Sequence, residues 1–335
     1  MRLGNRKNVS SGGAGTMAMT EKRDGAGAPR ISLKTRMKAW WEGYDLSGLK
    51  GGAGETGAHP CVQPAQQQQP AQGPGINRWG KPLWTATRIE VAEKLWGEGF
   101  NTPGGSDHIP YLVKPLGLNP AMSVLDLSAG LGGTSRTMAN QYGCWVTGLE
   151  ASELLAKEGM IRSFKEGLEK KAPIETYDPE RFSYPKRVDA IVYKEGMFSV
   201  RDKDQMFDGM ELALKPRGHV LMTDYIVEPA TAGAKAIQVW CDKEPMKPHL
   251  WTKDQMANGF AQRNLDLRIA EDITDTHRGL ILLAIQGLVE HLERHHMDQA
   301  TKLAVMEEVE MWVRRVAAIE AGLKVYRFYA LKPAE

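Results

Sequence analysis

The hydrophobic residues after Trp79 follow two alternating patterns along the chain. Short apolar runs predict buried strands, and longer segments with apolar residues three or four positions apart predict amphipathic helices. Strands are expected at residues 123–127, 145–150, 188–193, 218–225, 265–273 and 324–331, with a short third strand before Asp178. Helices are expected at residues 88–96, 134–142, 152–168, 203–214, 252–263, 276–295 and 299–321.

This order of elements predicts the fold class. Regular alternation of strands and helices is typical of an α/β protein with a Rossmann-like, doubly wound sheet whose two faces are covered by helices. We expect the sheet to be mostly parallel, with an antiparallel last strand. The two long helices within residues 276–321 separate the last two strands, so they are predicted to form an inserted helical hairpin.

Residues 1–78 lack this periodicity and are rich in Gly, Ala, Gln and Pro, which predicts a mostly disordered arm ahead of a domain at 79–335. Residues 32–46 of the arm differ, because apolar side chains fall on one helical stripe: Leu33, Met37, Trp40, Trp41 and Tyr44. Lysine and arginine flank this stripe. The pattern predicts an amphipathic helix that contacts a membrane surface or a partner, or else packs on its own domain or stays solvated.

Composition narrows the class of protein. The 335 residues are 42% hydrophobic and 25% charged, which is typical of a globular chain. The net charge of +2 is unevenly distributed, because residues 1–50 carry 10 Lys and Arg against 4 Asp and Glu. No apolar run reaches the length of a membrane span, and the three cysteines form no C-x-x-C pair. We therefore expect a cytoplasmic protein that is soluble or bound to a membrane surface.

The main chemical signal is the segment VLDLSAGLGGT at residues 124–134, where an apolar strand ends in an acid and runs into a glycine-rich turn. Glycines let a ligand approach the backbone, and the following helix start offers free N–H groups. The next predicted strand ends at Glu150, 24 residues after Asp126, where a carboxylate can accept both hydroxyls of a ribose. A dinucleotide and S-adenosylmethionine both fit these features.

Further details separate the two cofactors. A dinucleotide fingerprint starting at Gly130 would need Gly or Ala at Ser135. The acid-x-x-x-Gly-x-Gly-Gly spacing, followed by Glu150 and the turn LKPRG at 214–218, resembles class I S-adenosylmethionine-dependent methyltransferases. The segments GEGFNTPGG at 97–105 and TDY at 223–225 are similar to those of phosphoethanolamine-type small-molecule N-methyltransferases.

The resemblance covers residues 88–230 well and the C-terminal third in outline. It implies S-adenosylmethionine as cofactor, with the glycine turn around the methionine part, Glu150 on the ribose and Asp178 on the adenine amine. The implied cofactor-binding residues are Asp126, Ser128, Gly130, Gly132, Gly133, Glu150, Ala151, Asp178 and Lys194.

The acceptor site is less well defined by the resemblance. The family often has a His or Asp after its fourth strand, whereas this chain has KEGMF at 194–198. Glu195 is expected beneath the sulfonium, and Tyr225 and His249 are the further candidate catalytic residues, because aromatic faces and carboxylates suit a cationic amine and a histidine can accept its proton.

The sequence thus predicts a methyltransferase acting on a small molecule or lipid headgroup, with nitrogen as the favoured acceptor atom. Methylation of carbon or oxygen on a lipid-like or quinone acceptor is the alternative. A module that binds the cofactor without chemistry is the alternative from another class. No metal site and no nucleic-acid partner are expected, because His291 and His295 lack a third ligand and no nucleic-acid-reading motif accompanies the basic terminus.

Overall fold

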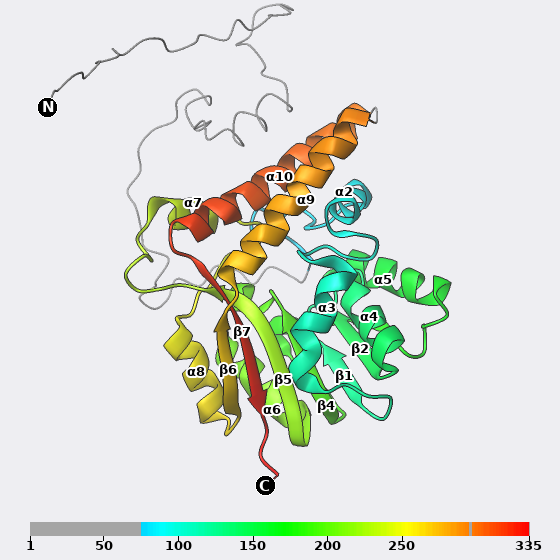
Figure 1. Ribbon diagram of the computed structural model, residues 1–335, viewed down its shortest axis with the longest axis vertical. Coiled ribbons are helices and arrows are strands. Elements are labelled where there is room, and N and C mark those ends of the chain that lie inside the picture. Colours follow the sequence, from blue (N-terminus) through cyan, green and yellow to red (C-terminus); the bar gives the residue numbers. More distant parts are fainter. Residues whose placement is uncertain (1–74, 295–296, 335) are drawn as a thin grey trace, which may run out of the picture. The chain divides into compact units, whose positions relative to one another are not determined.

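A computed structural model describes residues 75–294 and 297–334. Its strands form one sheet in the order β3-β2-β1-β4-β5-β7-β6 (Figure 1). The strands are β1 (Ser123–Asp126), β2 (Trp145–Glu150), β3 (Ile174–Thr176), β4 (Val188–Lys194), β5 (Leu214–Ile226), β6 (Asp266–Asp272) and β7 (Lys324–Leu331). The sheet is parallel apart from β7, which pairs antiparallel with both β5 and β6. The predicted fold class is confirmed.

The helices follow the predicted alternation. They are α2 (Ala86–Trp96), α3 (Gly105–Val113), α4 (Gly133–Tyr142), α5 (Glu153–Lys165), α6 (Lys203–Ala213), α7 (Lys235–Lys243), α8 (Lys253–Gln262), α9 (Thr274–Arg294) and α10 (Gln299–Glu320). Three short 3-10 helices complete the described part of the chain: η2 (Lys114–Leu116), η3 (Pro179–Arg181) and η4 (Met197–Ser199).

Alternating side chains give the sheet two buried faces. Residues such as Leu125 of β1 and Ile191 of β4 belong to a core cluster with Phe207 of α6 and Phe260 of α8. Asp126 faces the other side, where its carboxylate accepts a hydrogen bond from Ser135 of α4. Because successive side chains of a strand point to opposite faces of the sheet, one apolar strand can pack against the helices on both faces.

The α9–α10 hairpin lies between β6 and β7 in the chain and crosses above the sheet end where the parallel strands terminate (Figure 1). It packs against α2 and α7. The rings of Trp96 on α2 and Trp312 on α10 meet edge to face with centroids 4.6 Å apart. The hairpin therefore covers the edge of the sheet at which ligands of such folds bind.

Two features of the fold differ from the sequence prediction. β5 begins at Leu214 rather than at residue 218, because Leu214 pairs with Val188 and the residues before His219 form a bulge. Arg217 of this bulge has a φ of 61°. The helices α3 and α7 were not predicted: α3 contains Pro110, which normally marks a helix end, and α7 has no side-chain cap at its start.

Most of the predicted arm, including residues 32–46, lies outside the described residues. Within the described residues, Ile76 forms a bridge with Pro82. Arg78 also donates a hydrogen bond of 2.7 Å to the carbonyl of Cys241. Among the described helices, none is long and apolar enough to cross a membrane.

The aromatic packing under the sheet generates a stability prediction. The Phe207 side chain is fully buried, with its ring centroid 4.9 Å from that of Phe260 and 6.0 Å from that of Trp251. Phe207→Ala should lower the free energy of unfolding by about 3–5 kcal/mol through lost burial and a residual cavity. Leu212→Ala on the same helix is the control, because Leu212 is 66% exposed. Urea unfolding followed by circular dichroism measures both, and equal losses would contradict the proposed packing.

Candidate active site

A cavity of about 180 Å³ opens at the carboxyl ends of β1, β2 and β4. Residues from the predicted cofactor site line one end, and residues of α2, α10 and the segment after α7 line the other. Its lining includes Trp84, Arg88, Asn101, Thr102, Leu127, Ser128, Glu150, Ala151, Tyr177, Tyr193, Lys194, Glu195, Phe198, Glu244, Met246, Glu308, Met311, Trp312 and Arg315. Five predicted site residues are thus brought together: Ser128, Glu150, Ala151, Lys194 and Glu195.

Asp126 ends β1 and is completely buried. One carboxylate oxygen accepts a hydrogen bond of 2.7 Å from the Ser135 hydroxyl. The other, Oδ1, has no hydrogen-bond partner among the described residues. Burial raises the pKa of Asp126 to about 6. An unpartnered buried carboxylate oxygen is costly, so this atom is suited to accept a hydrogen bond from a bound ligand or water.

The glycine-rich turn needs glycine for two reasons. Gly130 and Gly132 have φ values of 56° and 79°, a region that other residues rarely adopt. Gly133 is in contact with a second loop, because a Cβ atom there would lie 2.5 Å from the carbonyl oxygen of Gly99. The Gly133 N–H donates a 2.9 Å hydrogen bond to that oxygen. The loop at residues 97–105 therefore packs directly on the turn.

Glu150 ends β2 and lines the cavity. Its two carboxylate oxygens accept backbone hydrogen bonds, one of 2.9 Å from Gly130 and one of 2.8 Å from Ser152. Burial raises its pKa, while these N–H groups act in the opposite direction. Each carboxylate oxygen has a second lone pair, so Glu150 retains the capacity to accept from two hydroxyl groups.

Lys194 ties the loop at 97–105 to the sheet. Its ammonium group donates to the Thr102 hydroxyl at 2.6 Å and to the Pro103 carbonyl at 2.8 Å. Burial lowers the pKa of Lys194. Ser128 joins the same layer, because its hydroxyl donates a 2.6 Å hydrogen bond to the Lys194 carbonyl. These contacts hold the loop above the end of β1.

Glu195 lies directly after β4 with a φ of 56°, an unusual conformation for a residue with a side chain. Its side chain is directed toward Tyr225, whose hydroxyl lies 3.4 Å from Oε2. The Tyr225 hydroxyl also lies 3.0 Å from Nε2 of His277, which is in the first turn of helix α9. Strained backbone often occurs at functional sites, and here it places a carboxylate in the cavity.

His277 was not among the sequence candidates. Burial lowers its pKa, so its imidazole is neutral at pH 7. The sequence feature that could have identified His277 as a site residue was its position in the chain. It follows β6, a strand parallel to β5 that ends at the same edge of the sheet. Tyr225 itself is buried among the rings of Phe198, Trp240 and His277 and does not line the cavity.

Seven of the predicted site residues are not part of the cavity lining: Asp126, Gly130, Gly132, Gly133, Asp178, Tyr225 and His249. Asp178 caps η3, where its side chain accepts a 3.0 Å hydrogen bond from the Glu180 N–H. Its contact with adenine stays a prediction. His249 donates its backbone N–H to the Phe198 carbonyl at 2.7 Å, and burial lowers its pKa to about 4. Neither side chain is part of the cavity surface.

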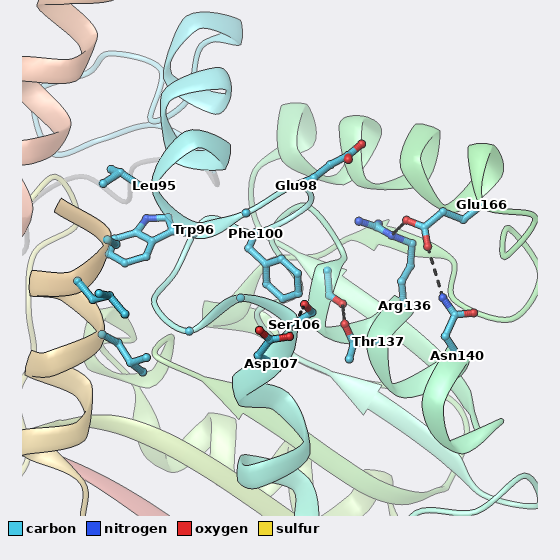
Figure 2. A pocket seen from close by; sticks show the side chains of 17 residues that line it. Leu95, Trp96, Glu98, Phe100, Ser106, Asp107, Arg136, Thr137, Asn140 and Glu166 are labelled. Carbon is cyan, nitrogen blue, oxygen red and sulfur yellow. Dashed lines mark hydrogen bonds and ion pairs between the residues drawn. The ribbon is translucent and has the colours of Figure 1, made fainter. Parts of the chain in front are cut away.

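A second, larger cavity of about 630 Å³ lies on the other side of the loop at 97–105 (Figure 2). Figure 2 shows Phe100 projecting into it from the loop and Arg136 reaching Glu166, with which it forms a 2.7 Å ion pair. Of the predicted cofactor-binding residues, it includes Gly133 alone. The smaller cavity is therefore the better candidate for the cofactor and acceptor.

Comparison with known proteins identifies the family. A family profile described as "Mycolic acid cyclopropane synthetase" matches residues 106–319, which is more than half of the chain. The chain belongs to this family of class I S-adenosylmethionine-dependent methyltransferases. Membership confirms the predicted enzyme class and the predicted cofactor.

Individual relatives agree with this assignment. Phosphoethanolamine N-methyltransferase 1 from Zea mays is 31% identical over 245 residues, covering 71% of this chain and 47% of the maize protein. The chain thus spans about half the length of that relative. Phosphoethanolamine N-methyltransferase 2 from Haemonchus contortus, solved with S-adenosyl-L-methionine, has a TM-score of 0.65 at 20% identity over 76% of this chain and 62% of that one. The cyclopropane synthase MmaA2 from Mycobacterium tuberculosis has a TM-score of 0.62 at 17% identity, with coverages of 74% and 94%.

The residues of this methyltransferase fit S-adenosylmethionine. Asp126 keeps an unpartnered buried carboxylate oxygen at the end of β1, and the Asn101 side chain, which lines the cavity, lies against Gly130. Glu150 lines the cavity with acceptor capacity for ribose hydroxyls. These features suit a ligand with an amino group and a ribose.

The raised pKa of Asp126 predicts how the stability of the protein depends on pH. Its folded pKa of about 6 exceeds the reference value of 3.8, so the folded state prefers the protonated form. The stability due to protonated Asp126 is present at low pH and is lost as the pH rises through the folded pKa. The free energy of unfolding of the wild type minus that of Asp126→Asn should therefore fall by about 1.4 kcal/mol between pH 5 and pH 8.

Urea unfolding of both proteins without cofactor at the two pH values checks this. Groups that do not interact with Asp126 cancel in the difference. A difference that is independent of pH would show that Asp126 is ionised throughout this range.

Proposed function

We propose that this protein transfers a methyl group from S-adenosylmethionine to a nitrogen atom of a small molecule or lipid headgroup. The observation that most directly supports this proposal is the position of Glu195, a buried carboxylate that lines the cavity at the end of β4. The cofactor supplies a methyl group already activated by its sulfonium. Catalysis then depends mainly on positioning the acceptor in line with that methyl group.

The side chains of this chain supply binding, orientation and proton handling. Glu195 would hold an ammonium group by ion pairing and accept its proton, so that the nitrogen gains a lone pair for attack. Tyr225 would fix the Glu195 carboxylate through its 3.4 Å hydrogen bond, and His277, 3.0 Å from the Tyr225 hydroxyl, would fix that hydroxyl. The loop held by Lys194 would keep water from the reacting atoms. The curated relatives that are N-methyltransferases support nitrogen as the acceptor atom.

Methylation of carbon on a lipid-like acceptor is the second candidate. It is favoured by the family description and by the apolar side chains at the far end of the cavity, among them Met246, Met311 and Trp312. This reaction needs no ammonium-binding carboxylate. Glu195 therefore favours the nitrogen acceptor over the carbon acceptor.

Localisation and domain organisation complete the proposal. We infer a cytoplasmic enzyme whose methyltransferase domain comprises residues 79–335. Residues 32–46 would contact a membrane surface or a partner, as their basic and aromatic composition suggests. Activity that depends on this segment and on added vesicles would support the membrane contact.

Product analysis tests the proposed reaction. The purified protein is incubated with S-adenosylmethionine carrying a labelled methyl group and with separate panels of amines, phenols, quinones and unsaturated lipids. N-methylated products are expected. Label on carbon or oxygen alone would favour the second candidate, and tight cofactor binding without any turnover would indicate a binding module.

Glu150 provides the test of the cofactor site. Glu150→Ala should weaken S-adenosylmethionine and S-adenosylhomocysteine binding at least tenfold, because two hydrogen bonds to a charged acceptor are lost. Glu175→Ala is the matched control, since Glu175 is an exposed residue of the neighbouring strand β3. Titration calorimetry measures both affinities. Unchanged binding in Glu150→Ala would disprove the ribose assignment, and binding of NADH by the wild type would question the cofactor class.

A further inference from the structure

The charged side chains that line the active-site cavity are more acidic than basic. Among the described lining residues, three are basic and four are acidic: Arg88, Lys194, Arg315, Glu150, Glu195, Glu244 and Glu308. An acceptor is recognised by the groups that are still available after these residues have satisfied one another. The available groups can be identified from the pairing of each basic side chain.

Arg88 already has three hydrogen-bond acceptors. Its Nε donates to Glu308 at 2.8 Å, and its terminal nitrogens donate to the Leu83 carbonyl and to the Met311 sulfur. The guanidinium also stacks on Trp84, with 4.2 Å from Cζ to the ring centroid. Glu308 is buried and accepts a second hydrogen bond, of 2.9 Å, from Trp312. An incoming anion would have to break this arrangement.

Arg315 is held in the same way. Its Nε and one terminal nitrogen donate to the two oxygens of Glu244, which also accepts a 2.6 Å hydrogen bond from Trp240. Both members of the pair are buried, and the guanidinium lies 4.3 Å from the Trp312 ring centroid. Buried bidentate pairs are costly to break, because each charge would then lack a partner.

Lys194 completes the set of basic residues. Two of its three donors are taken by Thr102 and Pro103, and its ammonium lies 3.8 Å from Oε1 of Glu195. All three basic residues of the lining therefore already have acceptors. A phosphate or carboxylate would have to compete with these acceptors and would lie close to several carboxylates.

In contrast to these basic residues, Glu195 has weak partners in the structure. Its carboxylate oxygens lie 3.8 Å from the Lys194 ammonium and 3.8 Å from Nε2 of the neutral His277, both longer than a hydrogen bond, and its hydrogen bond from Tyr225 is long at 3.4 Å. A buried carboxylate with such weak partners has capacity for a cation. Apolar and aromatic side chains complete the same end of the cavity: Phe198, Pro245, Met246, Met311 and Trp312.

We propose that the acceptor is a cationic amine with an apolar or aromatic body that carries neither phosphate nor carboxylate. Its ammonium pairs with Glu195, and its body lies against the aromatic and methionine side chains. This specificity rests on the proposed N-methyltransferase function and differs from that in the names of the phosphoethanolamine relatives.

Matched substrates test the proposal directly. Tyramine, O-phosphotyramine and tyrosine share one body and differ in a phosphate or a carboxylate, and ethanolamine with phosphoethanolamine gives a second pair. Transfer of labelled methyl groups from S-adenosylmethionine is measured for each. In each set in which methylation is detected, kcat/KM should be at least tenfold higher for the amine than for the substrates that carry a phosphate or a carboxylate.

The outcomes separate this inference from the function on which it rests. If phosphoethanolamine or O-phosphotyramine is methylated as well as or better than its parent amine, the N-methyltransferase function stands and the specificity is wrong. If no amine is methylated but a phenol or an unsaturated lipid is, both are wrong.

Two variants examine the charges themselves. Glu195→Gln should lower kcat/KM for the amine at least tenfold. Glu308→Gln removes the carboxylate that pairs with Arg88. The ratio of kcat/KM for the amine to kcat/KM for its phosphate ester should therefore become smaller. Glu175→Gln is the matched surface control and should leave all rates unchanged. Thermal melting confirms that each variant is folded. A folded Glu195→Gln with unaltered kinetics on the amine would overturn the proposal.

Discussion

The active site depends on a constraint of the parallel sheet, which brings the carboxyl ends of β1, β2, β4 and β5 to one edge. Asp126, Glu150, Glu195 and Tyr225 each lie at or directly after such an end. Residues that are far apart in the sequence therefore meet without long loops: Glu150 and Glu195 line one cavity, and Asp126 and Tyr225 are buried behind its lining. The loop at 97–105 and the α9–α10 hairpin complete the walls above this edge.

The positions of Asp126 and Glu150 in the fold could be predicted because their signals are local. An acid before a glycine-rich turn and a second acid after the next strand are readable from one sequence, since strand register fixes their spacing in space. Asp126 and Glu150 occupy the expected positions at the ends of β1 and β2. Asp178 was inferred from the resemblance alone, and its local capping of the Glu180 N–H is equally consistent with the sequence.

The acceptor half could not be predicted because its contacts are remote in the chain. Arg88 and Glu308 are 220 residues apart, and Glu244 and Arg315 are 71 residues apart. No periodicity connects such positions, and one of the helices involved, α7, lacks a side-chain cap that would have revealed it. His277 was missed for the same reason: its partner Tyr225 precedes it by 52 residues.

This division between local and remote contacts suggests how substrate choice is separated from cofactor binding. The cofactor end is built from strand ends and the turns that follow them, which the fold itself positions. The far end is built largely from helices α2 and α10 and from the segment after α7. A change in a pair such as Arg88 and Glu308 alters the charge presented to an acceptor while the strand ends stay in place. In the proposed acceptor site, the paired arginines would thus restrict the acceptor through charge, whereas Glu150 at the other end of the cavity would be left for the cofactor.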